Sequence, residues 1–222
     1  MPYWDRRESV LGLLRERRLR GWLLMDFRGS NPLLWQVLGG MPRGVHFTRR
    51  TFAWIASSGE VTLLAHAIEA GSVSDPRWTV QSYHNGASLR ERLAGFGLQG
   101  GTIAMEYSPM GELPYVSRVD GGTLDVVRSL GAEVVTSADL LQLAIAQWDE
   151  AQVAQHDRAA QLVDGVKNDA FALVGERVAA GQAVTEHEVS RFIEKQFAAR
   201  GLATIYHPTV AVGPNSANPH YE

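Results

Sequence analysis

The chain has 222 residues, of which 45% are hydrophobic and 20% are charged, and this balance is ordinary for a globular protein. The formal net charge is −3, which gives no electrostatic reason to expect nucleic acid as a partner. The sequence contains no cysteine, so disulfides, thiolate metal ligands and a cysteine nucleophile are excluded.

The sequence also lacks the apolar segments that membranes and export require. No apolar run approaches the roughly 20 residues that span a bilayer. The first residues, MPYWDRRESV, lack the apolar core of a signal peptide. We therefore expect no membrane partner and a cytoplasmic location.

The first two thirds of the chain alternate between strand-like and helix-like segments. Asp5 and Glu8 are spaced like a capping pair for a first helix. Ser30-Asn31-Pro32 begins another, with Ser30 or Asn31 as its cap, and Gly39-Gly40 stops it. The pattern predicts strands over residues 21–25, 45–56, 60–66, 78–83, 102–107 and 132–135, with helices near 88–94 and 122–130. This alternation predicts a mixed α/β domain with helices packed on a sheet.

From residue 137 to residue 180 no strand pattern remains. One apolar stripe recurs at steps of three and four, at Ala159, Val163, Val166, Ala170 and Leu173.

Gly181 ends that helix, and a second amphipathic helix follows it. Thr185 and Glu188 form a capping box at its start, and Gly201 closes it. The boundary between the two halves is expected at residues 147–150, as a helix or a short helix break.

Two motifs resemble known binding sites but lack the required context. Gly95, Gly97 and Gly100 form a G-x-G-x-x-G pattern, yet a helix precedes it and a strand follows, which reverses the dinucleotide-binding order. We interpret it as a helix end and a loop. His187-Glu188 begins like a zinc-peptidase motif, but Arg191 stands where the second histidine would be needed.

The histidines differ in how well their context indicates a role. His66 and Glu69 have a zinc-like spacing without a third ligand, so a strand-end histidine is the better interpretation. Three others are isolated and receive no role: His46, His84 and His156. His207 and His220 flank one glycine-rich segment, HPTVAVGPNSANPHYE. Here an apolar run at residues 210–212, expected as a strand, leads through a turn to His220.

From about Trp148 onward, the sequence resembles the pita-bread metallopeptidases, a family of Xaa-Pro aminopeptidases, prolidases and creatinase. The matching features are Asp149-Glu150, a Gly-x-x-x-Thr-Glu element at residues 181–186, and above all the segment 208–221. Residues 1–147 are similar to the creatinase/prolidase-type N-terminal domain, through the stretch DFRGSNP at residues 26–32.

The resemblance implies a specific site and cofactor. Family members hold two divalent metal ions, commonly Mn, Co or Zn, through two Asp, one His and two Glu. A histidine at the place of His220 lies beside those metals and binds the substrate or stabilises the tetrahedral intermediate; in creatinase-like members it acts as acid and base. The first metal-binding Asp follows this histidine in the family. We therefore expect no metal ligand in this chain, and no other substrate-binding residue is assigned.

The resemblance predicts an N-terminal mixed α/β domain at residues 1–147, followed by an incomplete α+β pita-bread catalytic domain at residues 148–222. It implies the front part of a proline-specific metallo-exopeptidase, acting on proline-containing peptides as a homodimer or homotetramer. The chain alone is expected to be inactive. Two alternatives remain open at this stage: a fragment of a metal-free creatinase-like amidinohydrolase, and a non-catalytic oligomerisation or binding module.

Overall fold

The computed structural model describes residues 3–41 and 44–221. The chain divides into two compact units, Met1–Gln147 and Trp148–Glu222, and each is described by itself.

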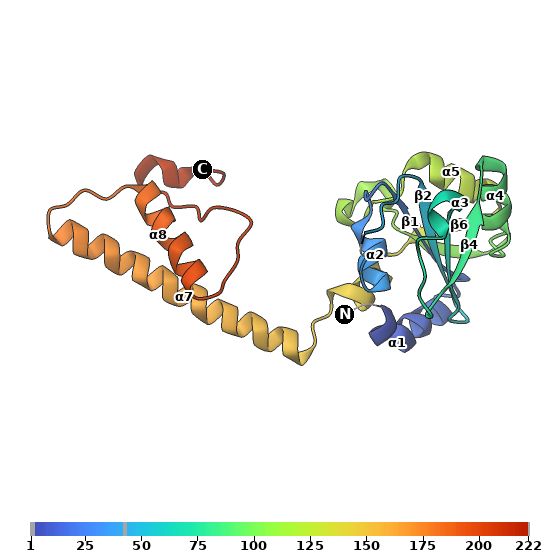
Figure 1. Ribbon diagram of the computed structural model, residues 1–222, viewed down its shortest axis with the longest axis horizontal. Helices are drawn as coiled ribbons and strands as arrows, with labels where there is room; N and C mark the ends of the chain where they lie inside the picture. The colour runs from blue at the N-terminus through green and yellow to red at the C-terminus, as the bar shows by residue number, and fades with distance from the viewer. Residues whose placement is uncertain (1–2, 42–43, 222) are drawn as a thin grey trace. The chain divides into compact units, whose positions relative to one another are not determined.

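The first unit is built around one six-stranded sheet (Figure 1). Its strands are β1 (Gly21–Phe27), β2 (Arg50–Ala56), β3 (Val61–His66), β4 (Thr79–Tyr83), β5 (Thr102–Met105) and β6 (Glu133–Thr136). They lie in the order β4-β3-β2-β1-β5-β6. The β1–β2 and β2–β3 pairs are antiparallel, and the β3–β4, β1–β5 and β5–β6 pairs are parallel. The sheet is therefore mixed, and the predicted α/β domain with helices packed on a sheet is confirmed.

Helices and short helical turns connect these strands. They are α1 (Tyr3–Glu16), α2 (Pro32–Leu38), α3 (Ala67–Ala70), α4 (Gly86–Ala94), the 3-10 turns η1 (Pro109–Gly111) and η2 (Pro114–Val116), α5 (Gly121–Ser129), α6 (Ala138–Leu141) and the π-helical turn η3 (Gln142–Ala146). Local sequence signals explain several of their limits. The Asn31 side chain caps α2 by accepting from the Leu33 N–H, and Gly39 ends the helix in a left-handed conformation that glycine adopts without strain.

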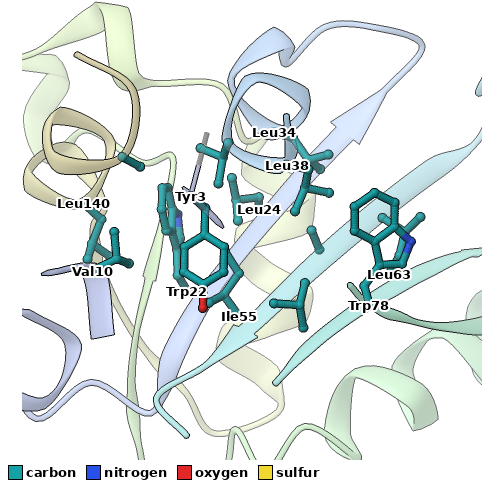
Figure 2. Close-up of a cluster of buried hydrophobic side chains, with 14 of the residues drawn as sticks. Tyr3, Val10, Trp22, Leu24, Leu34, Leu38, Ile55, Leu63, Trp78 and Leu140 are labelled. Atoms are coloured by element: carbon teal, nitrogen blue, oxygen red, sulfur yellow. The ribbon is translucent and has the colours of Figure 1, made fainter. Parts of the chain in front are cut away.

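The two faces of the sheet bury separate hydrophobic clusters, because successive strand residues point to opposite faces. On one face Trp22, Leu24 and Ile55 pack against α1, α2 and α6 (Figure 2). On the other face Leu23 and Phe52 pack against α4 and α5. Helices thus cover both faces of the sheet, which gives this unit a layered core of its own.

The second unit contains two helices and a long C-terminal segment. α7 (Glu150–Ala179) and α8 (Glu186–Ala199) pack against each other, and η4 (Gly213–Ala217) lies in the segment after them (Figure 1). The predicted capping box at Thr185 and Glu188 is confirmed, and Asp149 forms a further one with Gln152 at the start of α7.

The predicted stripe of α7 faces α8 only in part. Val166 and Ala170 are buried, whereas the side chain of Val163 is 45% exposed. Ala159 and Leu173 are half-buried.

Two sequence predictions are corrected by the structure. The first helix begins at Tyr3, so Asp5 lies inside its first turn instead of capping it. Residues 210–212 have no strand assignment, and the part of the second unit that the structure describes is helix and coil. An extended backbone becomes a strand only when a neighbouring strand satisfies its N–H and C=O groups, and none of the described residues pairs with this one. The part of residues 148–222 that the structure describes therefore contributes helices and coil to the incomplete domain.

Within the residues that the structure describes, no helix is long and apolar enough to cross a membrane.

Candidate functional site

His220 lies on the C-terminal segment of the second unit, directly before Tyr221, which contacts α8. Its backbone N–H donates to Asn218 Oδ1 at 3.0 Å, and its side chain is exposed. The imidazole borders a pocket of about 640 Å³ between α8 and this segment. The residues around the pocket are Glu186, His187, Ser190, Arg191, the run from Ile205 to Val210, Pro219, His220 and Tyr221. The pocket brings together His207 and His220, which the sequence had singled out, and His187, whose zinc-peptidase-like motif had been set aside.

Glu186, in the first turn of α8, receives most of the hydrogen bonds that hold this segment. The backbone N–H of Val212 donates to Glu186 Oε1 at 2.6 Å. The Asn215 side-chain amide lies 2.9 Å from Oε2, and the Tyr221 hydroxyl donates to Oε2 at 2.7 Å. One carboxylate therefore binds three donors from residues 212–221.

Two further residues on the same helix hold the beginning of the segment. Ser190 Oγ donates to the carbonyl oxygen of Pro208 at 2.8 Å. The Glu194 carboxylate pairs with His207 Nδ1. Since Glu186, Ser190 and Glu194 are four residues apart, they share one face of α8. We call these three residues the α8 polar stripe.

These contacts lower the pKa values of the two carboxylates in the stripe, those of Glu186 and Glu194. The Tyr221 hydroxyl, and then the Val212 N–H and the Asn215 amide, hold the pKa of Glu186 below its ordinary value. The same bond to Glu186 raises the pKa of Tyr221, because the hydroxyl loses its acceptor if it ionises. His207 likewise lowers the pKa of Glu194. The stripe is therefore anionic at neutral pH and suited to accepting hydrogen bonds.

The pocket does not fit the dinuclear metal centre that the family resemblance implies. Nowhere in residues 3–41 and 44–221 do three His, Cys, Asp or Glu side chains gather in a group able to hold a metal ion. Two divalent cations require several anionic ligands at short range. The oxygens of Glu186 are already engaged by three donors, and Glu194 is engaged by His207.

Sequence reasoning missed the α8 polar stripe. Glu186 stood out only as the last residue of the Gly-x-x-x-Thr-Glu element, and Ser190 and Glu194 received no role. The available signal was their spacing of four residues on a helix otherwise rich in apolar and basic side chains. That spacing shows a shared face, but it does not show which segment packs there.

A second polar cluster is buried inside the first unit and includes Asp26 and Asn31 of the stretch DFRGSNP. Glu106, just after β5, is fully buried and accepts from Trp22 Nε1 at 2.7 Å, Asn31 Nδ2 at 3.1 Å and Ser137 Oγ at 3.1 Å. Burial raises the pKa of Glu106 to about 7, although these donors favour its charged form. The carboxyl therefore links β1, the start of α2, β5 and the start of α6.

Asp26 completes this cluster by holding the turn that leads into α2. It accepts from the backbone N–H of Asn31 at 2.9 Å and of Gly29 at 3.2 Å, and from Trp35 Nε1 at 3.1 Å. Arg28 has φ 58° and Gly29 has φ 78°, so the turn passes through the left-handed region. The buried Asp26 and Asn31 therefore fix a turn whose other residues, 27–30, are exposed.

The motifs that the sequence analysis set aside have structural explanations. Gly95 ends α4 and β5 follows, which confirms the interpretation of the glycine pattern as a helix end and loop. His66 is the last residue of β3, and its ring lies 3.0 Å from the carbonyl oxygen of His84. Glu69 accepts from the N–H and hydroxyl of Thr48. Three isolated histidines are exposed: His46, His84 and His156.

Comparison by sequence finds no matching family model and no matching curated protein. Comparison by structure does find matches. A dipeptidase from Pyrococcus horikoshii superposes with a TM-score of 0.60 at 22% identity, over 98% of this chain and 56% of its own. A prolidase from Thermococcus sibiricus gives 0.62 at 18% identity, over 100% and 57%. Dipeptidase PepE from Mycobacterium ulcerans gives 0.64 at 21% identity, over 99% and 55%.

This chain has the fold of part of these dipeptidases and prolidases. The resemblance to the pita-bread family that residues 181–186 and 208–221 indicated is thereby confirmed at the level of the fold. The chain spans just over half the length of the three structures, from 55% to 57%.

Proposed function

We propose that this chain forms the N-terminal portion of a metal-dependent exopeptidase that hydrolyses Xaa-Pro bonds, in dipeptides or at peptide N-termini. One observation carries the proposal: nearly the whole chain, both units included, superposes on dipeptidases and a prolidase. The names of these structures favour a peptidase over the creatinase-like alternative. The proposal assigns residues 1–147 to the N-terminal domain and residues 148–222 to the start of the catalytic domain.

His220 is the residue of this chain that we assign to the chemistry. An exposed imidazole at the edge of a pocket is able to donate a hydrogen bond to a peptide carbonyl oxygen and to the oxyanion formed from it. In the complete enzyme it would bind the proline-containing substrate or stabilise the tetrahedral intermediate. This role needs no metal ligand from the chain itself.

The metal ions belong to the complete enzyme in this proposal. There, Mn, Co or Zn would bind and activate the water molecule that attacks the peptide bond. The described residues offer no group of metal ligands, so we expect the 222-residue chain to show no peptidase activity of its own. Assembly into a homodimer or homotetramer and a cytoplasmic location remain predictions from the sequence.

The test uses the complete reading frame that contains this chain. Its product, supplied with Mn²⁺ and an Xaa-Pro dipeptide, is expected to hydrolyse the dipeptide and to lose this activity when a chelator is added. His220→Ala should lower the turnover by at least about 100-fold. His156→Ala is the matched control, because His156 is exposed on α7 and does not line the pocket.

Three results would contradict the proposal. They are a reading frame that stops after Glu222, turnover that survives His220→Ala, and chelator-sensitive turnover by the 222-residue chain alone. A stable, inactive oligomer of the 222-residue chain combined with the first result would favour the non-catalytic module instead.

A further inference from the structure

The C-terminal segment that carries His220 has little regular structure of its own. Apart from the 3-10 turn η4, residues 202–221 form neither helix nor strand. Backbone without a ladder of hydrogen bonds keeps its conformation only through contacts with neighbouring elements. The position of the His220 ring therefore depends on what ties this segment to α8.

The ties are concentrated on one side chain. The three donors to Glu186 come from Val212, just before η4, from Asn215 within it, and from Tyr221, directly after His220. Glu186 thus binds the segment on both sides of His220. The bonds from Ser190 and Glu194 reach only Pro208 and His207, which precede this turn.

Glu186 is itself held firmly. It is the first residue of α8, next to Thr185, whose hydroxyl accepts from the Glu188 N–H while the Glu188 carboxylate accepts from the Thr185 N–H. This capping box fixes the helix start from which the Glu186 carboxylate projects. Hydrogen bonds to an ionised acceptor are also roughly twice as strong as neutral ones.

We propose that Glu186 is the positioning residue for His220: by binding Val212, Asn215 and Tyr221 it sets the place of the imidazole at the edge of the α8 pocket. The inference rests on the proposed function for the meaning of that placement, since His220 is assigned to the reaction there. Ser190 and Glu194 guide the beginning of the segment along α8 and play a smaller part.

The experiment measures the position of the segment in the 222-residue chain and does not depend on turnover. NMR relaxation reports the mobility of the His220 amide and ring, and hydrogen exchange reports the protection of the Val212 N–H. Glu186→Ala is compared with the matched control Glu176→Ala, which changes an exposed glutamate on α7 that does not line the pocket. Circular dichroism checks that the helices persist in both variants.

We expect Glu186→Ala to raise the exchange rate of the Val212 N–H at least about tenfold, because a hydrogen bond to a charged group is lost. His220 should become mobile, while Glu176→Ala leaves both readouts unchanged. Glu186→Gln keeps one acceptor oxygen and should give an intermediate change, and Tyr221→Phe, which removes one bond, a smaller one.

Unchanged mobility of His220 in Glu186→Ala, or an equal change in Glu176→Ala, would overturn the inference. If Glu186→Ala unfolds the helices, Tyr221→Phe decides: a helical variant in which His220 stays as ordered as in the parent chain would also overturn it. The test of the proposed function has an outcome independent of this one. Failure here leaves dipeptide hydrolysis by the complete protein intact, whereas absent hydrolysis would leave the docking of His220 intact.

Discussion

The two units of this chain are stabilised in different ways. The first has a six-stranded sheet with a hydrophobic cluster on each face. The second has two helices, and Val166, Ala170 and Val189 are its only buried hydrophobic residues among those that the structure describes. Hydrogen bonds from α8 hold much of its C-terminal segment. The comparison teaches that the first unit has a core sufficient for an independent domain, whereas the second relies on a few apolar contacts and a network of hydrogen bonds.

Large apolar side chains are exposed in both units, for example Met110 at 93% in the first, but they are more frequent in the second unit, which is about half as long. On α7 the side chain of Phe171 is 71% exposed and that of Val178 is 62% exposed. In the C-terminal segment Ile205 is 89% exposed and Val212 is 71% exposed. Contiguous exposed apolar surface promotes association. This unit is therefore the part of the chain from which we expect self-association to arise.

The largest expected effect tests the core of the first unit. Leu24 is fully buried between the sheet and its helices, so Leu24→Ala should lower the free energy of unfolding by about 2–5 kcal/mol. Val163→Ala in the second unit is the comparison, because its side chain is 45% exposed and little packing is lost. Denaturant titration of both variants measures the difference; equal losses would contradict the contrast between the units.

The next effect concerns the buried carboxyl of the first unit and pH. The folded-state pKa of Glu106 is about 7, above its ordinary 4.5, so the native protein binds this proton more tightly than the unfolded chain does. Its contribution to stability is therefore complete below about pH 4.5 and is lost as the pH rises through 7. The full difference corresponds to about 3 kcal/mol.

Glu106→Gln removes this titration and isolates it from all other groups. The free energy of unfolding of the parent chain should fall between about pH 5 and about pH 8 relative to that of Glu106→Gln. Denaturant titration at the two pH values gives the comparison. Parallel pH profiles in the two proteins would show that Glu106 is ionised throughout and would refute the raised pKa.

A smaller effect tests the second unit at the start of α8. Thr185→Ala breaks the capping box with Glu188 and should destabilise the helix by about 1 kcal/mol. Since this unit buries few side chains, the loss should appear as reduced helicity by circular dichroism. Thr209→Ala serves as control, because Thr209 is exposed and lies outside the helices. A helical signal unaffected by Thr185→Ala would mean that packing, and not capping, sets the limit of α8.

Local signals in the sequence were enough to predict most of the fold. Residues 30–32 and Gly39-Gly40 mark the two ends of α2, because capping depends on neighbours in sequence. The prediction of a strand at residues 210–212 was wrong because strand formation does not depend on neighbours in sequence alone. An apolar run becomes a strand only beside a partner, and the partner is a tertiary feature.

The candidate site was predictable only in part. A family resemblance indicated His220, but no local pattern showed that Glu186 would bind the segment around it. Val212, Asn215 and Tyr221 lie 26 to 35 residues away from Glu186 along the chain. The buried role of Glu106 was missed for the same reason, because its donors Trp22 and Asn31 come from distant elements. Contacts of this kind are set by packing and not by sequence spacing.

Hydrogen exchange along the whole chain tests the contrast between the units most directly. The backbone N–H groups of β1 and β2 should exchange only through global opening of the first unit, while those of α7 and α8 should exchange at least about tenfold faster through local opening. Equal protection in β1 and in α7 under the same conditions would contradict the account, because it would show that the second unit is as stably folded as the first.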